Sequence, residues 1–177
     1  MPPAVSAWVS EIFSWGTINL SVAFLSGLAV GLLVAHKARG PVSSWFAMLP
    51  GLICHELAHF LVATVTGSDP SPISLFPKRI KGGWELGSVR FSPGWSTAGF
   101  VALAPLYLLP PIAVLVVHEF AKAAAGEQAL AGYVVATLIW GAWPSGPDWK
   151  IALRYPLGTF ILGAIAALLT VHFLHQG

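Results

Sequence analysis

Charged side chains are scarce in this chain. Lys, Arg, Asp and Glu together make up 9% of its 177 residues, whereas hydrophobic residues make up 56%. A soluble domain carries about a quarter charged residues, so this composition argues against a water-soluble surface and predicts a membrane protein. The few basic residues lie in the connections between apolar segments. This pattern argues against a nucleic-acid partner and leaves the lipid bilayer as the expected surroundings.

Cysteine is scarcer still. Cys54 is the only one, so no intrachain disulfide is expected. We interpret it as a small buried apolar residue rather than a metal ligand. The N-terminus also lacks the basic stretch and cleavage site of a signal peptide. Apolar residues at helical spacing over residues 1–15 predict a short interfacial helix there, or an extension of the first membrane span.

Long apolar runs, by contrast, are abundant. They predict an all-α polytopic membrane protein in which residues 1–177 form a single domain. About five transmembrane helices are expected, over residues 18–35, 42–66, 97–117, 129–143 and 157–174.

Two interruptions of this helical pattern are expected. Pro50 predicts a kink or a helix restart within the second span. Residues 67–97 are rich in Pro and Gly, and residues 73–76 and 84–91 have the pattern of two short strands. We therefore expect a small β-hairpin between the second and third spans, either re-entrant or on the surface.

The first predicted span contains two glycines four residues apart, Gly27 and Gly31. This spacing is typical of close packing between membrane helices. The partner helix can belong to the same chain, which we favour, or to a second protomer, which would make a homo-oligomer through the Gly27/Gly31 face.

The sequence His55-Glu56-Leu57-Ala58-His59 lies inside the second predicted span. Histidines four residues apart on a helix point the same way, so both imidazoles can bind one Zn²⁺ ion. The glutamate between them can act as the general base toward an attacking water. Glu56 is also the only acidic residue between positions 42 and 66. An ionisable group in hydrocarbon costs about 2.5–3.5 kcal/mol on insertion scales, which favours a functional interpretation.

A catalytic zinc site usually has three protein ligands. Asp148 is the best third candidate because it lies where an apolar helix is interrupted, at Pro144-Ser145-Gly146-Pro147-Asp148. The same residues also fit a helix start, with Ser145 as N-cap and Asp148 at the capping-box position. With both histidines present we favour the ligand, and Asp148 can serve both purposes. A second His-Glu pair, at His118-Glu119, has Lys122 in place of a second histidine and is interpreted as an interfacial loop.

Charge bias predicts an orientation. With five alternating spans, residues 67–97 and 144–156 share one side, which holds Lys78, Arg79, Lys81, Arg90, Lys150 and Arg154. The other side holds Lys37, Arg39 and Lys122. The positive-inside rule places the first side, and the metal ligands near it, toward the cytoplasm of a cell (inner) membrane.

The histidine motif within a span, the Gly- and Pro-interrupted hairpin region and the aspartate at a helix break resemble the site-2 protease family of intramembrane zinc metalloproteases. The chain is similar to a minimal member without PDZ or CBS domains. The resemblance implies one zinc ion held by His55, His59 and Asp148, with Glu56 as the base and membrane proteins as substrates. The chain departs from the family pattern at Ala58 and Trp149, where glycine is common. It also has Leu108 where the family often has asparagine.

Two other functions fit the same residues. A catalytically silent membrane protein could use the histidines to bind a metal for transport or regulation, with Glu56 replaceable. A scaffold could pack a partner through Gly27 and Gly31 and bind no metal. Metal content separates the scaffold from the other two, and the effect of Glu56→Gln separates the protease from the silent metal-binding protein.

Overall fold

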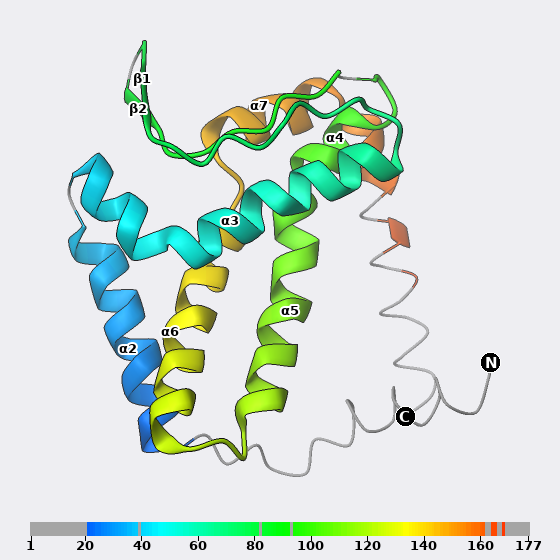
Figure 1. Cartoon of the computed structure of the whole chain (residues 1–177). Coiled ribbons are helices and arrows are strands. Elements are labelled where there is room, and N and C mark those ends of the chain that lie inside the picture. Colours follow the sequence, from blue (N-terminus) through cyan, green and yellow to red (C-terminus); the bar gives the residue numbers. More distant parts are fainter. Residues whose placement is uncertain are drawn as a thin grey trace.

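The computed structural model describes residues 21–161 except 39, 82 and 93, together with residues 164, 165 and 168. As expected, this part of the chain is mainly helical and carries one small sheet (Figure 1). Its elements are α2 (Val22–Lys37), α3 (Pro41–Val65), β1 (Lys78–Ile80), β2 (Gly83–Glu85), α4 (Ala98–Ala102), α5 (Ala104–Phe120), α6 (Ala125–Ala142) and α7 (Gly146–Arg154). The expected helix over residues 1–15 and most of the last expected span lie outside the described residues, although residues 156–161 are helical.

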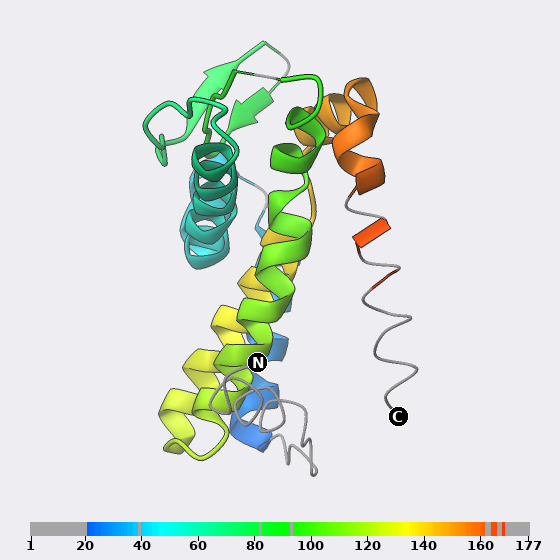
Figure 2. The same ribbon diagram turned by 90° about the vertical axis from the view of Figure 1, so that its right-hand side faces the viewer.

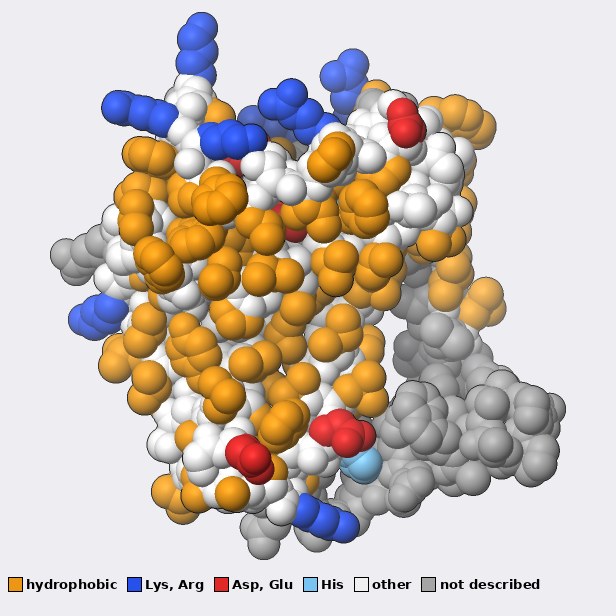
Figure 3. Space-filling model, viewed as in Figure 1, with side chains coloured by type: hydrophobic (Ala, Val, Ile, Leu, Met, Phe, Trp, Pro, Cys, Tyr) orange, Lys and Arg blue, Asp and Glu red, His pale blue; other side chains and the backbone are white. Residues whose placement is uncertain are grey.

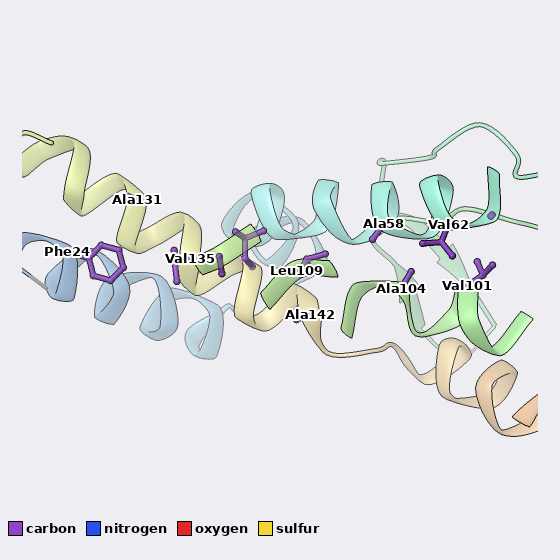
Figure 4. Close-up of a cluster of buried hydrophobic side chains, with 12 residues drawn as sticks. Phe24, Ala58, Val62, Val101, Ala104, Leu109, Ala131, Val135 and Ala142 are labelled. Atoms are coloured by element: carbon purple, nitrogen blue, oxygen red, sulfur yellow. The ribbon is translucent and has the colours of Figure 1, made fainter. Parts of the chain in front are cut away.

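Helices α2, α5 and α6 form a bundle, and α3 lies across one end of it. Figure 1 shows α3 passing over the ends of α6 and α5, and Figure 2 shows it nearly end-on while α5 is seen along its length. The core between these helices is built mainly from small side chains and a few larger ones (Figure 4). It includes Phe24, Ala58, Val62, Val101, Leu109, Ala131, Val135 and Leu138.

The glycine pair of α2 packs against α6 of the same chain. A Cβ on Gly27 would overlap the backbone carbonyl of Ala129, and a Cβ on Gly31 would lie 2.6 Å from Cβ of Ala136. Only glycine lets two helix backbones approach this closely. The favoured interpretation, packing within the chain, is therefore the one observed, and this face of α2 is occupied by α6.

Helix α2 runs in a different direction relative to α6 from the one expected for five alternating spans. Residue numbers rise in the same direction along both helices, because Gly27 lies against Ala129 and Gly31 lies against Tyr133 and Ala136. Helices α2 and α6 are therefore parallel. Strict alternation makes the first and fourth spans antiparallel. The difference arises because α3 crosses the bundle end instead of running beside the other helices. The Lys37 end of α2 is consequently directed toward the same end of the bundle as α7, and away from Lys122.

Element boundaries differ from expectation in two further places. The third expected span is divided at Leu103 into a short α4 and a longer α5. Helix α6 begins at Ala125, four residues earlier than expected, where the Glu127 side chain accepts a hydrogen bond from the backbone N–H of Ala124. At Pro50 the kink is observed and the restart is not, since α3 continues through this residue as a bent helix (Figure 1).

The expected hairpin is present between α3 and α4. Strand β1 pairs antiparallel with β2, from Lys78 opposite Glu85 to Ile80 opposite Gly83. These strands lie at the tip, and the predicted strand segments 73–76 and 84–91 meet lower down through an isolated bridge between Ser74 and Ser88. Figure 1 shows the tip projecting from the body, while the base of the hairpin lies against α3. The hairpin is thus a surface element with a base that reaches the interior.

Hydrophobic side chains cover much of the surface between two charged ends (Figure 3). One end carries the hairpin and α7 with exposed Lys78, Arg79, Lys81, Arg90, Lys150 and Arg154. The opposite end, where α5 connects to α6, carries Glu119, Lys122 and Glu127. Among the described residues, α3 alone is long and apolar enough to cross a membrane, and α2 and α5 are shorter apolar helices.

Candidate metal centre

His55 and His59 lie one turn apart on α3 and are both buried. Because four residues make slightly more than one helical turn, the two rings project from the same face, toward α4, α6 and α7. Their Nε2 atoms lie 3.1 Å apart. The two imidazoles therefore converge, as their spacing in the sequence predicted.

The other ring nitrogen of each histidine is held by a backbone carbonyl. Nδ1 of His55 donates to the carbonyl of Gly141, at 2.6 Å, and Nδ1 of His59 donates to the carbonyl of Val101, at 2.9 Å. A carbonyl can only accept a hydrogen bond, so the proton of each neutral ring resides on Nδ1. Both Nε2 atoms then present lone pairs to each other. Such carbonyl partners are the usual means of orienting a metal-binding histidine.

Asp148 completes the cluster from the first turn of α7. Its Oδ1 lies 3.4 Å from Nε2 of His59, and its Oδ2 lies 3.5 Å from Nε2 of His55. Asp148 is also the capping-box residue that the sequence predicted. Its Oδ2 accepts hydrogen bonds from the backbone N–H of Ser145, at 2.7 Å, and from the Ser145 hydroxyl, at 2.5 Å. One carboxylate therefore both caps α7 and faces the two imidazoles.

The charge state of Asp148 follows from these neighbours. Burial alone would raise the pKa of this carboxyl, because desolvation disfavours the ionised form. When Nε2 of either histidine is protonated, its hydrogen bond to Asp148, together with the hydrogen bond from Ser145, outweighs burial and holds the pKa of Asp148 below its usual range. The carboxylate is consequently ionised at neutral pH, as a metal ligand must be.

The three side chains could hold a metal ion, by the spacing and by the chemistry of their donor atoms. Two ligand atoms about 2.0–2.1 Å from a tetrahedral zinc lie about 3.3 Å from each other. Here the two Nε2 atoms are 3.1 Å apart, each lies 3.4 or 3.5 Å from a different oxygen of Asp148, and one ligand atom from each residue can be chosen so that all three lie within 4.8 Å of one another. Two imidazole lone pairs and a carboxylate are all electron donors, so their convergence in a buried site is unfavourable without a cation. The cluster can therefore bind a metal ion, and its donor set is one that zinc accepts.

Glu56 and all three candidate ligands line the same cavity, which has a volume of about 460 Å³. The Glu56 side chain is buried beneath the base of the hairpin, and a Cβ built on Gly87 would lie 2.8 Å from its Oε1. Most of the remaining wall is apolar, with Trp84, Trp140 and Trp143 among its residues. The arrangement offers a base beside a metal-binding cluster in a cavity suited to apolar ligands.

Other sequence candidates lie away from this cavity. Cys54 packs against the hydrophobic core and does not line the cavity, as expected for a small apolar residue. His118 and Glu119 lie in the last turn of α5 rather than in the expected loop, and they pair loosely, at 3.8 Å, at the opposite end of the bundle. Leu108, the position where an amide would be expected by resemblance, packs against the core.

Sequence reasoning missed the parts of the centre contributed by the backbone. The carbonyls of Gly141 and Val101 orient the histidines, and Gly87 allows the hairpin to lie against Glu56. A carbonyl is present in every residue, so no sequence pattern could have identified those two. Gly87 carried only the general indication that a glycine in a strand can mark close approach of the backbone.

Comparison of the chain with protein-family models, curated proteins and solved structures gave no match. The argument for function therefore depends on the geometry of the centre and on the composition of the surface around it.

Proposed function

We propose that this chain is a multi-pass membrane zinc endopeptidase of the site-2 protease type, which hydrolyses peptide bonds in or near transmembrane segments of membrane proteins. The observation that carries the proposal is the convergence of His55, His59 and Asp148 in one apolar cavity with Glu56. One zinc ion per chain is expected. When bound, the ion would polarise the scissile carbonyl and lower the pKa of the attacking water toward about 7.

The residues of the chain supply the proton transfers. Glu56 takes one proton from the attacking water as the new C–O bond forms. It then gives that proton to the departing amine as the peptide C–N bond breaks, which returns the carboxylate to its starting state. The wall of the cavity is mainly apolar, and a substrate that fills it would displace water and strengthen the electrostatic interactions within it.

The base of the hairpin is the proposed binding edge for substrate. Ser88 and Arg90 direct their backbone N–H groups to Ser74 and Ser71. In an antiparallel pair the alternate residues, here Gly87 and Val89, present their backbone groups to the other edge. Residues 84–91 all line the cavity. A transmembrane helix must unwind before its carbonyls can react. An extended segment could be held by strand addition along this edge.

We propose that the end carrying the metal centre faces the cytoplasm. The basic residues favour this orientation by the positive-inside rule. Lys37 adds to the bias, because the parallel course of α2 and α6 directs it toward the same end as the centre. Three exposed tryptophans, Trp84, Trp95 and Trp143, also support the proposal, because tryptophan is enriched at membrane–water boundaries.

The decisive test compares Glu56→Gln with wild type in detergent or lipid nanodiscs, using a single-span membrane protein as substrate. Loss of a general base lowers the rate by about 10²–10⁴-fold. The variant should keep about one zinc per chain, because Glu56 is not a ligand in the proposed site. Glu119→Gln is the matched control, since Glu119 is an exposed glutamate at the far end of the bundle and should not change the rate.

Cleavage at the wild-type rate by Glu56→Gln would contradict the proposed mechanism. A wild-type protein that holds zinc but cleaves no membrane substrate would favour the second candidate, a catalytically silent metal-binding or regulatory protein. The presence of Leu108 rather than an amide favours that candidate. Absence of zinc from wild type, even after supplementation, would leave only a scaffold.

A further inference from the structure

Helices α3 and α6 cross with their backbones in contact at glycine. A Cβ on Gly51 would overlap the backbone carbonyl of Thr137. On the facing helix, a Cβ on Gly141 would lie 2.8 Å from the carbonyl oxygen of Gly51. Real Cβ atoms do not approach backbone so closely, so any larger residue at Gly51 must push the helices apart.

This crossing lies one helical turn from the metal centre. Gly51 and His55 are four residues apart on α3 and therefore face the same neighbour, α6. Gly141 is in the last turn of α6, which ends at Ala142. Carbonyls in the last turn of a helix have no partner within the helix. The crossing places one of these free carbonyls, that of Gly141, 2.6 Å from Nδ1 of His55.

The same contact is supported on its other side. Tyr133, two turns before Gly141 on α6, donates its hydroxyl hydrogen bond to the carbonyl of Ala47, at 2.6 Å. Ala47 lies one turn before Gly51 on α3. The two helices are thus held together at Ala47, Gly51 and His55, and only the middle contact depends on the absence of a side chain.

We propose that the Gly51–Gly141 crossing is a positioning device for the metal centre. By setting the distance between α3 and α6, it keeps the Gly141 carbonyl on Nδ1 of His55 and so directs the Nε2 lone pair to the metal. Gly51 and Gly141 act through His55 and do not touch the metal or a substrate. The inference rests on the proposed metal site and adds two residues to it that lie outside the histidine motif.

The test measures zinc affinity of the full-length protein by competition with a chromophoric chelator. Loss of a partner that orients a metal-binding histidine weakens metal affinity by about 10- to 100-fold. We expect a loss of this size for Gly51→Ala and a smaller one for Gly141→Ala, whose Cβ meets a less severe contact. The visible absorption bands of the Co²⁺-substituted protein should also shift, more in Gly51→Ala than in Gly141→Ala.

Two control variants separate positioning from general packing. Gly27→Ala creates an equally severe overlap in the α2–α6 interface, but remote from His55. Gly126→Ala adds a Cβ to α6 where no atom lies within 4 Å. Neither variant should change zinc affinity in the folded protein, although Gly27→Ala should lower thermal stability.

A second readout follows the hydrogen bond without metal. In long-range ¹⁵N–¹H spectra of histidine-labelled protein, His55 should show a proton on Nδ1 in wild type and in Gly126→Ala, and a tautomer mixture in Gly51→Ala. Unchanged zinc affinity together with an unchanged Nδ1 proton in Gly51→Ala would overturn the inference and leave the proposed function intact. Equal losses of affinity in Gly27→Ala and Gly51→Ala would also overturn it. If Gly51→Ala does not fold, Gly141→Ala decides the question by the same criteria.

Wild-type protein without zinc would instead overturn the proposed function. The Nδ1 readout would then show on its own whether the crossing sets the tautomer of His55.

Discussion

Asp148 has two roles that the structure combines in one carboxylate. Its Oδ2 caps α7 through the backbone and hydroxyl of Ser145, and both of its oxygens face the imidazoles of the centre. The sequence favoured the ligand and allowed Asp148 to serve both purposes, although a Ser-x-x-Asp pattern beside a proline is by itself sufficient evidence for a helix cap. Only the distances to His55 and His59 show that the capping carboxylate also lies beside both imidazoles.

Substitution of Asp148 should therefore affect metal and stability together. Asp148→Ala removes one of three ligands, and we expect zinc content to fall well below one per chain. It also removes the cap of α7, at a cost of about 1 kcal/mol. Zinc per protein and the thermal unfolding temperature measure the two effects.

Ser145→Ala separates them. It weakens the cap while leaving the Asp148 carboxylate, so stability should fall while most of the zinc is retained. Equal zinc content in wild type and Asp148→Ala would show that Asp148 is a cap alone.

At the scale of elements, the hairpin contacts α3, and no feature of the sequence predicted this contact. The base of the hairpin lies over Glu56, and a Cβ on Gly87 would be 2.8 Å from Oε1 and 3.0 Å from Cγ of that residue. Proline and glycine content predicted a hairpin in residues 67–97 correctly. It did not predict that the base would line the cavity, because this contact joins residues about 30 positions apart and depends on how the segment folds back over α3.

Gly87→Ala tests the functional meaning of that contact. The added methyl group should displace the Glu56 carboxylate, and misplacement of a catalytic group by about 1 Å can lower the rate by 10²-fold. We expect a lower rate of substrate cleavage with unchanged zinc content, since Gly87 contacts no ligand. Gly126→Ala is again the neutral control, and an unchanged rate in Gly87→Ala would show that Glu56 tolerates the displacement.

At the scale of the whole molecule, the course of α2 decides the topology. The length of the apolar segments identified the helices, but it does not tell in which direction each helix runs. The assumption of five alternating spans placed Lys37 and Lys122 on the same side. The glycine contacts make α2 parallel to α6, so the beginning of α2 lies with the α5–α6 connection instead. A hydrogen bond between Ser21 and Gln128 joins these two regions.

Single-cysteine labelling distinguishes the two topologies. In a Cys54→Ala background, cysteines can be introduced at Lys81 on the hairpin, at Lys122 in the α5–α6 connection and at Val22, which is 84% exposed at the start of α2. A membrane-impermeant maleimide should reach Lys81→Cys from the cytoplasmic side and the other two from the opposite side. Labelling of Val22→Cys from the same side as Lys81→Cys would restore five alternating spans.

The sequence by itself determined which side chains can form the candidate metal centre. Histidines four residues apart on a helix converge because of the helical repeat, and a helix start at Ser145 fixes Asp148 in the first turn because the free N–H groups of a helix N-terminus need an acceptor. These relations are local, and they hold in any fold that keeps the helices. The tertiary structure alone decided the distances among the ligands, the carbonyls that orient the histidines, the cover over Glu56 and the direction of α2. Each of these depends on contacts between segments that are distant in the sequence, and most of the contacts involve backbone groups, which every residue carries and which no sequence pattern distinguishes.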